Sequence, residues 1–159
     1  MKSAPKKIFL DCEFTDFVDF EMISVGLVAE SGEEFYAELS MDAKTCSAFV
    51  QLSVLPQLGK SPELVCTDIS QVGDRLHTWF AGFGGELVVL YDFFPDYCLL
   101  LEALGGELPT NVVGSNNIYA RLDTAKHKEF YCRPGVVRHH ALWDARANLV
   151  AYQGMERQL

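Results

Sequence analysis

A nearly unbroken apolar run, residues 22–29, is the feature that most limits how this chain can fold. The run is one strand long, and a strand that is apolar on both faces belongs in the middle of a covered sheet. Residues 7–14 before it alternate in polarity, and Ser31-Gly32 after it offers a turn into residues 35–39. Three strands in this order predict an antiparallel hairpin at the centre of the sheet.

The following part of the chain predicts helices and parallel strands. Apolar residues recur at helical spacing over residues 68–81, and a short apolar strand follows at residues 87–91. A strand, a helix and a second strand in that order predict a crossover connection and a parallel pairing. A further helix is expected from about Pro95 to Leu104. The last is expected from about Ala141 to Tyr152, with its buried face formed by Leu142, Ala145, Leu149 and Tyr152.

Two segments give weaker signals. Residues 41–67 contain several helix-breaking prolines and glycines and indicate a long connection with one short helix. Residues 111–133 show little pattern beyond the start of a strand at Val112-Val113. The predicted fold class is therefore α/β: a mixed sheet, with an antiparallel hairpin plus parallel strands, flanked by helices within one domain spanning residues 1–159.

Composition limits where the protein works. Its apolar stretches are broken well before the length of a membrane span, so we expect a soluble protein with no membrane association. The five cysteines are scattered and include no Cys-x-x-Cys pair. This pattern argues against a disulfide framework and a structural zinc, and it suits a reducing cytoplasm.

Acidic side chains lie near the end of the first predicted strand and near the start of the last predicted helix. Asp11 and Glu13 alternate on the first strand and therefore share a face. His139 precedes Asp144 by five residues, a separation at which two side chains of one helix do not meet, so His139 is expected in the loop before the last helix. Carboxylates suit hard divalent cations, and a histidine can accept a proton near neutral pH.

A third position for an acid lies in the middle of the chain. Asp92 follows the predicted strand at residues 87–91, and Asp96 falls at the start of the next helix. Either carboxylate would lie near Asp11 and Glu13 if the two strands pair in parallel. The residues alone leave the choice between them open.

Three strings of the sequence resemble the motifs of the DEDDh family of 3′→5′ exonucleases, which share the ribonuclease H-like fold. Residues 11–14 match the first motif, Asp-x-Glu-[Phe or Thr], and residues 139–145 match every fixed position of the third, His-x-Ala-Leu-x-Asp-Ala. The second motif usually reads His-Asn-x-x-x-[apolar]-Asp or a close variant, and the helix starts at its terminal, metal-binding Asp. Here Tyr91-Asp92 stands at the His-Asn position, so the resemblance favours Asp96 over Asp92.

The resemblance implies a metal-dependent 3′→5′ exoribonuclease that acts on the 3′ end of single-stranded RNA. Asp11, Glu13, Asp96 and Asp144 would coordinate two Mg²⁺ or Mn²⁺ ions, and His139 would be the general base. Within the family, residues 21–26, 33–37 and 139–146 look most like the small adenosine-preferring exoribonucleases of the ribonuclease AS type. The substrate-binding residues expected from this placement are Phe14, Thr15, Glu21 and Arg138.

Base preference is predicted from Glu21. A carboxylate only accepts hydrogen bonds, and adenine offers an amino donor where uracil offers a carbonyl oxygen. If Glu21 reaches the terminal base beside Phe14, RNA ending in adenosine should be degraded faster than RNA ending in uridine.

The net charge of −9 argues against binding a long duplex. Part of that charge belongs to the candidate metal ligands, and the segment before His139 gathers Lys126, Lys128, Arg133 and Arg138. This pattern suits a single-stranded end better than a duplex.

The sequence is also compatible with other functions. The same metal site would serve an exonuclease acting on DNA or on short oligonucleotides. A catalytically silent module that binds RNA or a protein is a third reading, although such modules commonly lose an acid and every candidate acid is present here. The motifs also leave open whether the enzyme works as a monomer or a homodimer.

Overall fold

The computed structural model describes residues 4–153, so residues 1–3 and 154–159 of the expected domain lie outside the described part. The strands are β1 Lys6–Phe14, β2 Met22–Ala29, β3 Glu34–Leu39, β4 Val65–Cys66, β5 Leu87–Tyr91 and β6 Val112–Asn117. The helices are α1 Ala48–Ser53, α2 Ile69–Ala81, α3 Phe94–Ala103, α4 Thr124–Tyr131 and α5 Ala141–Ala151. Short 3-10 turns are η1 Ala43–Thr45, η2 Leu55–Gln57, η3 Pro62–Leu64 and η4 Tyr119–Arg121.

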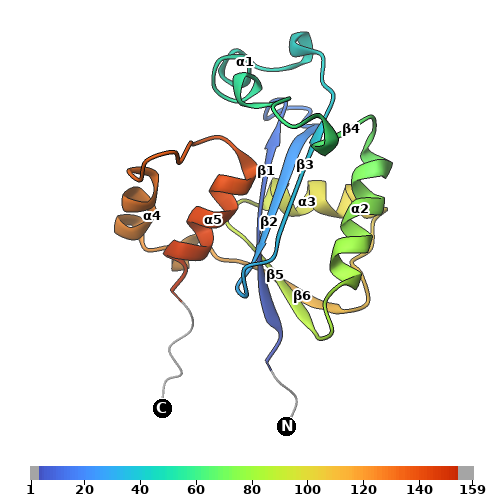
Figure 1. Ribbon diagram of the computed structural model, residues 1–159, viewed down its shortest axis with the longest axis vertical. Helices are drawn as coiled ribbons and strands as arrows, with labels where there is room; N and C mark the ends of the chain where they lie inside the picture. The colour runs from blue at the N-terminus through green and yellow to red at the C-terminus, as the bar shows by residue number, and fades with distance from the viewer. Residues whose placement is uncertain (1–3, 154–159) are drawn as a thin grey trace.

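The strands form one six-stranded mixed sheet in the order β4-β3-β2-β1-β5-β6. β1, β2 and β3 pair antiparallel, whereas β5 pairs in parallel with β1 and with β6. The predicted hairpin and crossover are confirmed. The α/β class with a mixed sheet between helices is confirmed as well, and the layout is compatible with a ribonuclease H-like fold (Figure 1).

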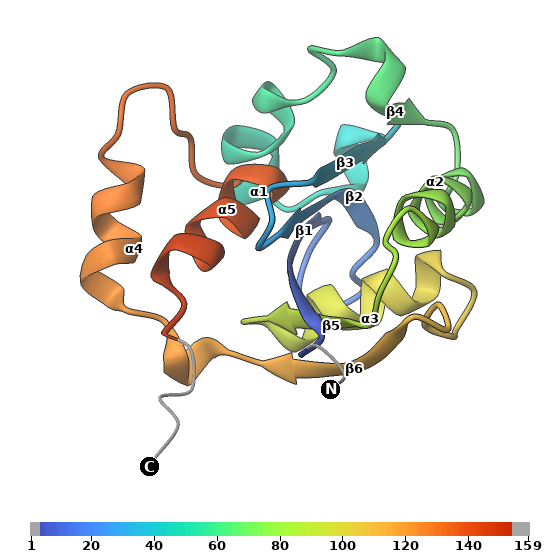
Figure 2. The ribbon, with the colours of Figure 1, turned by 60° about the horizontal axis from the view of Figure 1, so that its bottom comes forward.

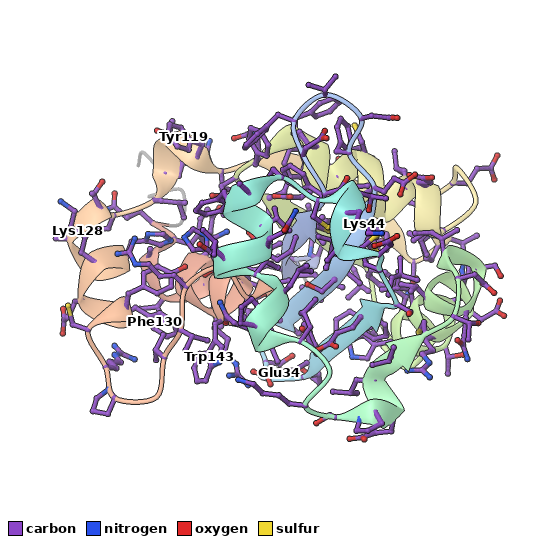
Figure 3. The ribbon with its side chains drawn as sticks, turned by 90° about the horizontal axis from the view of Figure 1, so that it is seen from above. Glu34, Lys44, Tyr119, Lys128, Phe130 and Trp143 are labelled. Carbon is purple, nitrogen blue, oxygen red and sulfur yellow. The ribbon has the colours of Figure 1, made fainter. Side chains whose placement is uncertain are left out.

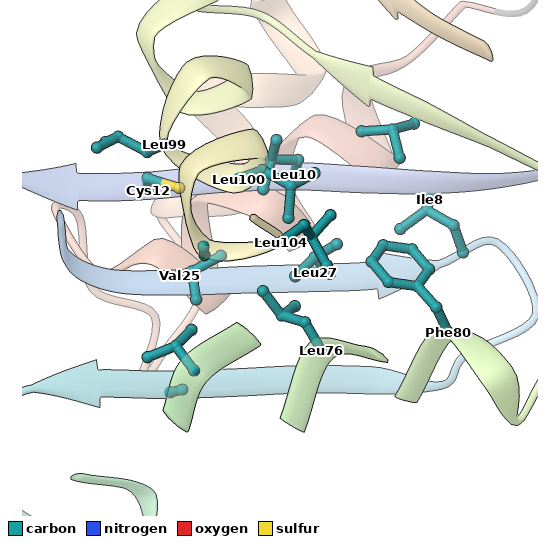
Figure 4. Packing of buried hydrophobic residues seen from close by; sticks show 14 of the residues in the cluster. Ile8, Leu10, Cys12, Val25, Leu27, Leu76, Phe80, Leu99, Leu100 and Leu104 are labelled. Carbon is teal, nitrogen blue, oxygen red and sulfur yellow. The ribbon is translucent and has the colours of Figure 1, made fainter. Parts of the chain in front are cut away.

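Helices cover both faces of the sheet, with α2 and α3 on one side and α5 on the other, and α4 packs against α5 (Figure 2). The main core lies between the sheet and α2 and α3, where Leu10 of β1, Phe80 of α2 and Leu100 of α3 are fully buried (Figure 4). Phe9 and Leu90 point to the opposite face and form a smaller cluster with Ile118. The alternation along β1 therefore divides its side chains between two cores, as its sequence predicts.

α5 lies unusually close to β2, and small residues make this approach possible. A Cβ atom at Gly26 would lie 2.5 Å from the backbone carbonyl carbon of Ala141, so glycine is required there. The predicted buried face of α5 is confirmed only at Ala145, which is fully buried, while Leu142 stays partly exposed. Bulky side chains cannot enter so narrow a gap, and Leu149 and Tyr152 pack instead beside the Phe9 cluster.

The two weak segments contain structure that the sequence pattern does not reveal. Residues 41–67 include α1, three 3-10 turns and the two-residue strand β4, which pairs in parallel with β3. Residues 111–133 hold β6 as expected, followed by α4, which we did not predict. α4 buries only Phe130, so it has no apolar stripe, and it begins where the Asp123 side chain accepts backbone N–H bonds.

All five cysteines are free thiols, as the sequence predicts. Within residues 4–153, no helix combines the length and the apolar character that crossing a bilayer would take.

Candidate active site

Three separate elements bring acidic side chains to one end of β1. Asp11 and Glu13 extend from β1, Asp96 lies in the first turn of α3, and Asp144 lies in the first turn of α5. Carboxylate oxygens of Asp11, Asp92 and Asp96 lie within 4.8 Å of one another. A second group, within the same distance, joins Glu13 and Asp144 to a ring nitrogen of His139. All five residues predicted for catalysis therefore meet here.

Asp92 and Asp96 both belong to this site, and each is held by a bond from another segment. The Asp96 carboxylate is buried and accepts the backbone N–H of Cys12. The Asp92 carboxylate accepts a 2.8 Å hydrogen bond from Nδ2 of Asn148, a buried residue of α5. The geometry offers both carboxylates to a cation, so the choice of Asp96 stays a prediction.

Asp144 has a partner that the sequence pattern does not indicate. The hydroxyl of Tyr131, the last residue of α4, donates a hydrogen bond to Oδ1 of Asp144. The guanidinium of Arg138 lies 4.4 Å from the centre of the Tyr131 ring. α4 thus places an aromatic and a cation beside the acids. Figure 3, which looks onto this end of the sheet, shows α4 on one side, marked by Lys128 and Phe130.

Burial and mutual repulsion make these acids hard to ionise together. Burial, followed by the charges of the neighbouring carboxylates, raises the pKa of Asp11 well above its usual range. Burial and the neighbouring Asp144 raise the pKa of Glu13 to about 9, and burial and Asp92 raise that of Asp96 to about 8. Such shifts mark carboxylates gathered around a place where positive charge is expected.

The donor set fits Mg²⁺ or Mn²⁺. Hard cations bind carboxylate oxygens, and the two groups supply five carboxylates and one imidazole. Neither of these two groups, within residues 4–153, contains a cysteine.

His139 and His140 have different surroundings although they are adjacent. The imidazole of His139 meets the acids on one side and the edge of Phe49, 4.9 Å away between ring centres, on the other. The imidazole of His140 stacks on Tyr36 of β3 at 4.6 Å, and burial lowers its pKa. Only His139 is placed to act on a group bound at the acids.

Three hollows meet around His139, and we name them for their walls. The acidic cleft, about 300 Å³, lies over Asp11, Glu13, Asp96 and Asp144 and is bordered by Phe93. The α4 hollow, about 220 Å³, shares some of these acids and reaches His127, Tyr131, Arg138 and Asn148. The apolar slot, about 570 Å³, lies between the β1–β2 loop and α1; its walls are Phe14, Phe17, Phe49 and Val50, with Asp16 and Ser47.

The four predicted substrate-binding residues do not lie together in the structure. Phe14 lines the acidic cleft and the apolar slot, and Arg138 lines the α4 hollow. Thr15 is buried; its hydroxyl donates to the Asp19 carbonyl and accepts the Glu21 N–H, which closes the loop. Glu21 is exposed at the base of that loop and lines none of the three hollows.

Sequence reasoning missed several side chains that line the hollows. Phe49 and Ser47 belong to the segment that shows no clear pattern, and Tyr131 belongs to the unpredicted α4. Asp16 lies in an acidic stretch that looks like an ordinary loop. No spacing within the chain connects these residues to the motifs, because the contacts arise only when distant segments pack.

The chain matches no protein-family model and no curated protein sequence.

Proposed function

We propose that the protein is a divalent-cation-dependent 3′→5′ exonuclease that acts on the 3′ end of single-stranded RNA. The observation that carries the proposal is the meeting of Asp11, Glu13, Asp96, Asp144 and His139, from four segments, beside an apolar slot. The residues of the three family-like motifs are the ones that converge. The layout of the fold is compatible with this assignment.

Asp11, Glu13, Asp96 and Asp144 would hold two cations, with Asp92 as an additional carboxylate beside Asp11 and Asp96. The bound cations would neutralise charge on the phosphoryl oxygens and stabilise the departing 3′ oxygen. In their absence the protein's acids repel one another and retain protons, as their raised pKa values indicate. The enzyme should therefore be inert in chelator.

His139 would accept the proton of the attacking water at one of its ring nitrogens. This step needs a neutral imidazole. Its place beside Glu13 and Asp144 lets it reach a water bound over the acids. His140, stacked against Tyr36, would support the backbone rather than the chemistry.

The apolar slot suits the terminal base of a single strand. Phe14, Phe17 and Phe49 offer ring surface, and Phe17 is 79% exposed before any ligand binds. Stacking of a base on an aromatic side chain contributes about 1–3 kcal/mol.

An adenosine preference is part of the proposal. The slot contains Asp16, whose carboxylate could accept a hydrogen bond from the amino group of adenine, whereas Glu21 lines no part of it. Comparing rates on poly(A) and poly(U) for the Asp16→Asn and Glu21→Gln variants would show which acid, if either, carries the preference.

The α4 hollow suits the phosphates that precede the scissile bond. Arg138 and His127 line it, and Lys126 and Lys128 lie on α4 with His127. The free thiols of the chain fit a reducing compartment, and we propose the cytoplasm. Gel filtration would show whether the active form is a monomer or a homodimer.

The decisive test uses a single-stranded 20-mer labelled at its 5′ end, as RNA and as DNA, with Mg²⁺ or with chelator. We expect a ladder that shortens from the 3′ end and releases mononucleotides, faster on RNA, and none with chelator or with Asp144→Asn. Faster shortening of DNA, or activity only on fragments of a few nucleotides, would favour the two related exonuclease readings. Binding of RNA without hydrolysis by the intact protein would favour the silent module.

A further inference from the structure

We propose that Gln57 is a positioning residue that fixes the backbone of the general base, His139. Gln57 ends η2, in the segment between β3 and β4, and lies 82 residues from His139 in the sequence. The inference rests on the proposed function, because it concerns how the base of that reaction is held.

The contact is made by one amide nitrogen. Nε2 of Gln57 donates to the carbonyl oxygen of Arg138 at 2.7 Å and to that of His139 at 3.1 Å. The carbonyl of Ser53, one turn earlier, lies 2.7 Å from the same nitrogen, so the two N–H groups of Gln57 are shared among three acceptors. An atom surrounded by three carbonyl oxygens has to be the amide nitrogen, so the orientation of this side chain is fixed by its partners.

These two carbonyls are the ones that define the conformation of His139. The carbonyl of Arg138 belongs to the peptide plane before the Cα atom of His139, and the carbonyl of His139 belongs to the plane after it. Anchoring both planes to one nitrogen therefore restricts φ and ψ of His139 together.

The conformation held in this way is an unfavourable one for histidine. His139 has a φ of 59°, and it is the one non-glycine residue within residues 4–153 whose φ is positive. Side chains other than glycine enter this left-handed region at a cost and stay there when their surroundings hold them. Hydrogen bonds from Gln57 supply such a restraint, and the result directs the imidazole to Glu13 and Asp144.

The same segment also contacts the ring of His139. Phe49 of α1 meets the imidazole edge-on, and α1 and η2 are joined directly through Val54. Residues 48–57 thus contact His139 at its backbone through Gln57 and at its side chain through Phe49. The next residue, His140, is anchored separately by stacking on Tyr36.

The test compares Gln57→Met with Gln51→Met as a matched control. Both changes remove a side-chain amide from the α1–η2 segment; Gln51 Nε2 donates at 2.9 Å to the carbonyl of Cys46, which is not part of the site. We expect Gln57→Met to lower kcat roughly 10- to 100-fold, the scale of a misplaced catalytic group, with KM changed less than about 3-fold. Gln51→Met should retain the wild-type kcat.

A double variant separates positioning from general damage. His139→Ala should lower kcat roughly 10²- to 10⁴-fold, and adding Gln57→Met to it should cause no further loss, because Gln57 acts through the imidazole. Multiplicative losses in the double variant, or equal losses in Gln57→Met and Gln51→Met, would overturn the proposal.

A spectroscopic readout keeps the inference independent of activity. The three-bond coupling between the amide and Hα protons of residue 139 reports φ, and we expect Gln57→Met to change it while Gln51→Met does not. An unchanged coupling would refute the role of Gln57. If the wild-type protein hydrolyses no nucleic acid, the proposed function fails, and this coupling still decides whether Gln57 holds the backbone.

Discussion

At the scale of single residues, the crowded carboxylates that the proposed function needs lower the stability of the folded protein. Asp96 is almost completely buried beside Asp11 and Asp92, and burial is the larger cause of its raised pKa, about 8. A carboxyl group whose pKa is higher in the folded than in the unfolded protein binds protons more tightly when folded. Its contribution to the free energy of unfolding therefore falls as the pH rises from about 4 to 8.

The first prediction follows for Asp96→Asn. In chelator, this variant should match the wild type near pH 4 and exceed its free energy of unfolding by about 1–3 kcal/mol at pH 8, where the wild-type carboxylate is forced to ionise. Urea unfolding at several pH values measures this difference. The exposed residue Asp74 supplies the control, Asp74→Asn, which should show no such trend. If Asp96→Asn is less stable than the wild type at pH 8, the claim that the ionised Asp96 carboxylate destabilises the folded protein is contradicted.

At the scale of elements, the parts of the fold with a strong local pattern could be predicted, and those made by packing could not. β1, β2 and α2 follow from alternation or helical spacing in their own residues. α4 was missed because only Phe130 is buried in it, and β4 because two residues carry no periodicity. The packed face of α5 was only partly predicted, since a helix lying this close to a sheet replaces leucine with alanine at the contact.

The residues of the candidate site also fall into two sets, those that stand in sequence motifs and those that only packing brings to the site. Asp11, Glu13, Asp144 and His139 stand in motifs that the sequence displays, so their meeting could be expected. Tyr131, Phe49 and Gln57 touch the site only because α4 and the α1–η2 segment fold back onto it. Glu21 was expected near the terminal base, but hydrogen bonds between Thr15 and Glu21 close the loop and leave Glu21 outside the hollows.

The second prediction concerns the close approach of α5 to the sheet. Gly26→Ala would place a methyl group 2.5 Å from backbone atoms of Ala141 and Leu142, which neither element can avoid without moving. We expect a loss of about 1–3 kcal/mol in the free energy of unfolding and a displacement of the α5 N-terminus that lowers kcat. Gly84→Ala is the control, because a Cβ atom there would meet nothing within 4 Å. Equal stability of the two variants would contradict the packing described.

At the scale of the whole molecule, a protein of net charge −9 can contact a polyanion only through limited regions. Arg138 lines the α4 hollow, which shares Asp11 and Asp144 with the acidic cleft, and Lys126 and Lys128 lie on α4. Figure 3 shows Lys128 at the α4 edge of the molecule and Lys44 on η1 away from that edge. The path of the strand across the surface is therefore testable by removing one lysine at a time.

The third prediction compares Lys128→Gln with Lys44→Gln. If the strand passes α4, Lys128→Gln should raise KM for single-stranded RNA about 2- to 5-fold at low salt with kcat unchanged, and the effect should fade as salt screens the phosphates. Lys44→Gln should leave KM unchanged. The opposite ranking in steady-state assays would place the strand along η1 instead.

The central claim is that acids from three elements, β1, α3 and α5, form one site for two divalent cations. Calorimetric titration of the chelator-treated protein with Mn²⁺ tests it most directly, in the wild type and in Asp144→Asn, with Asp74→Asn as the control. We predict two ions bound per chain in the wild type and in the control, and loss of at least one of them in Asp144→Asn, whose carboxylate lies in the group with Glu13 and His139. A wild-type protein that binds no Mn²⁺, or an Asp144→Asn variant that binds it unchanged, would contradict the account.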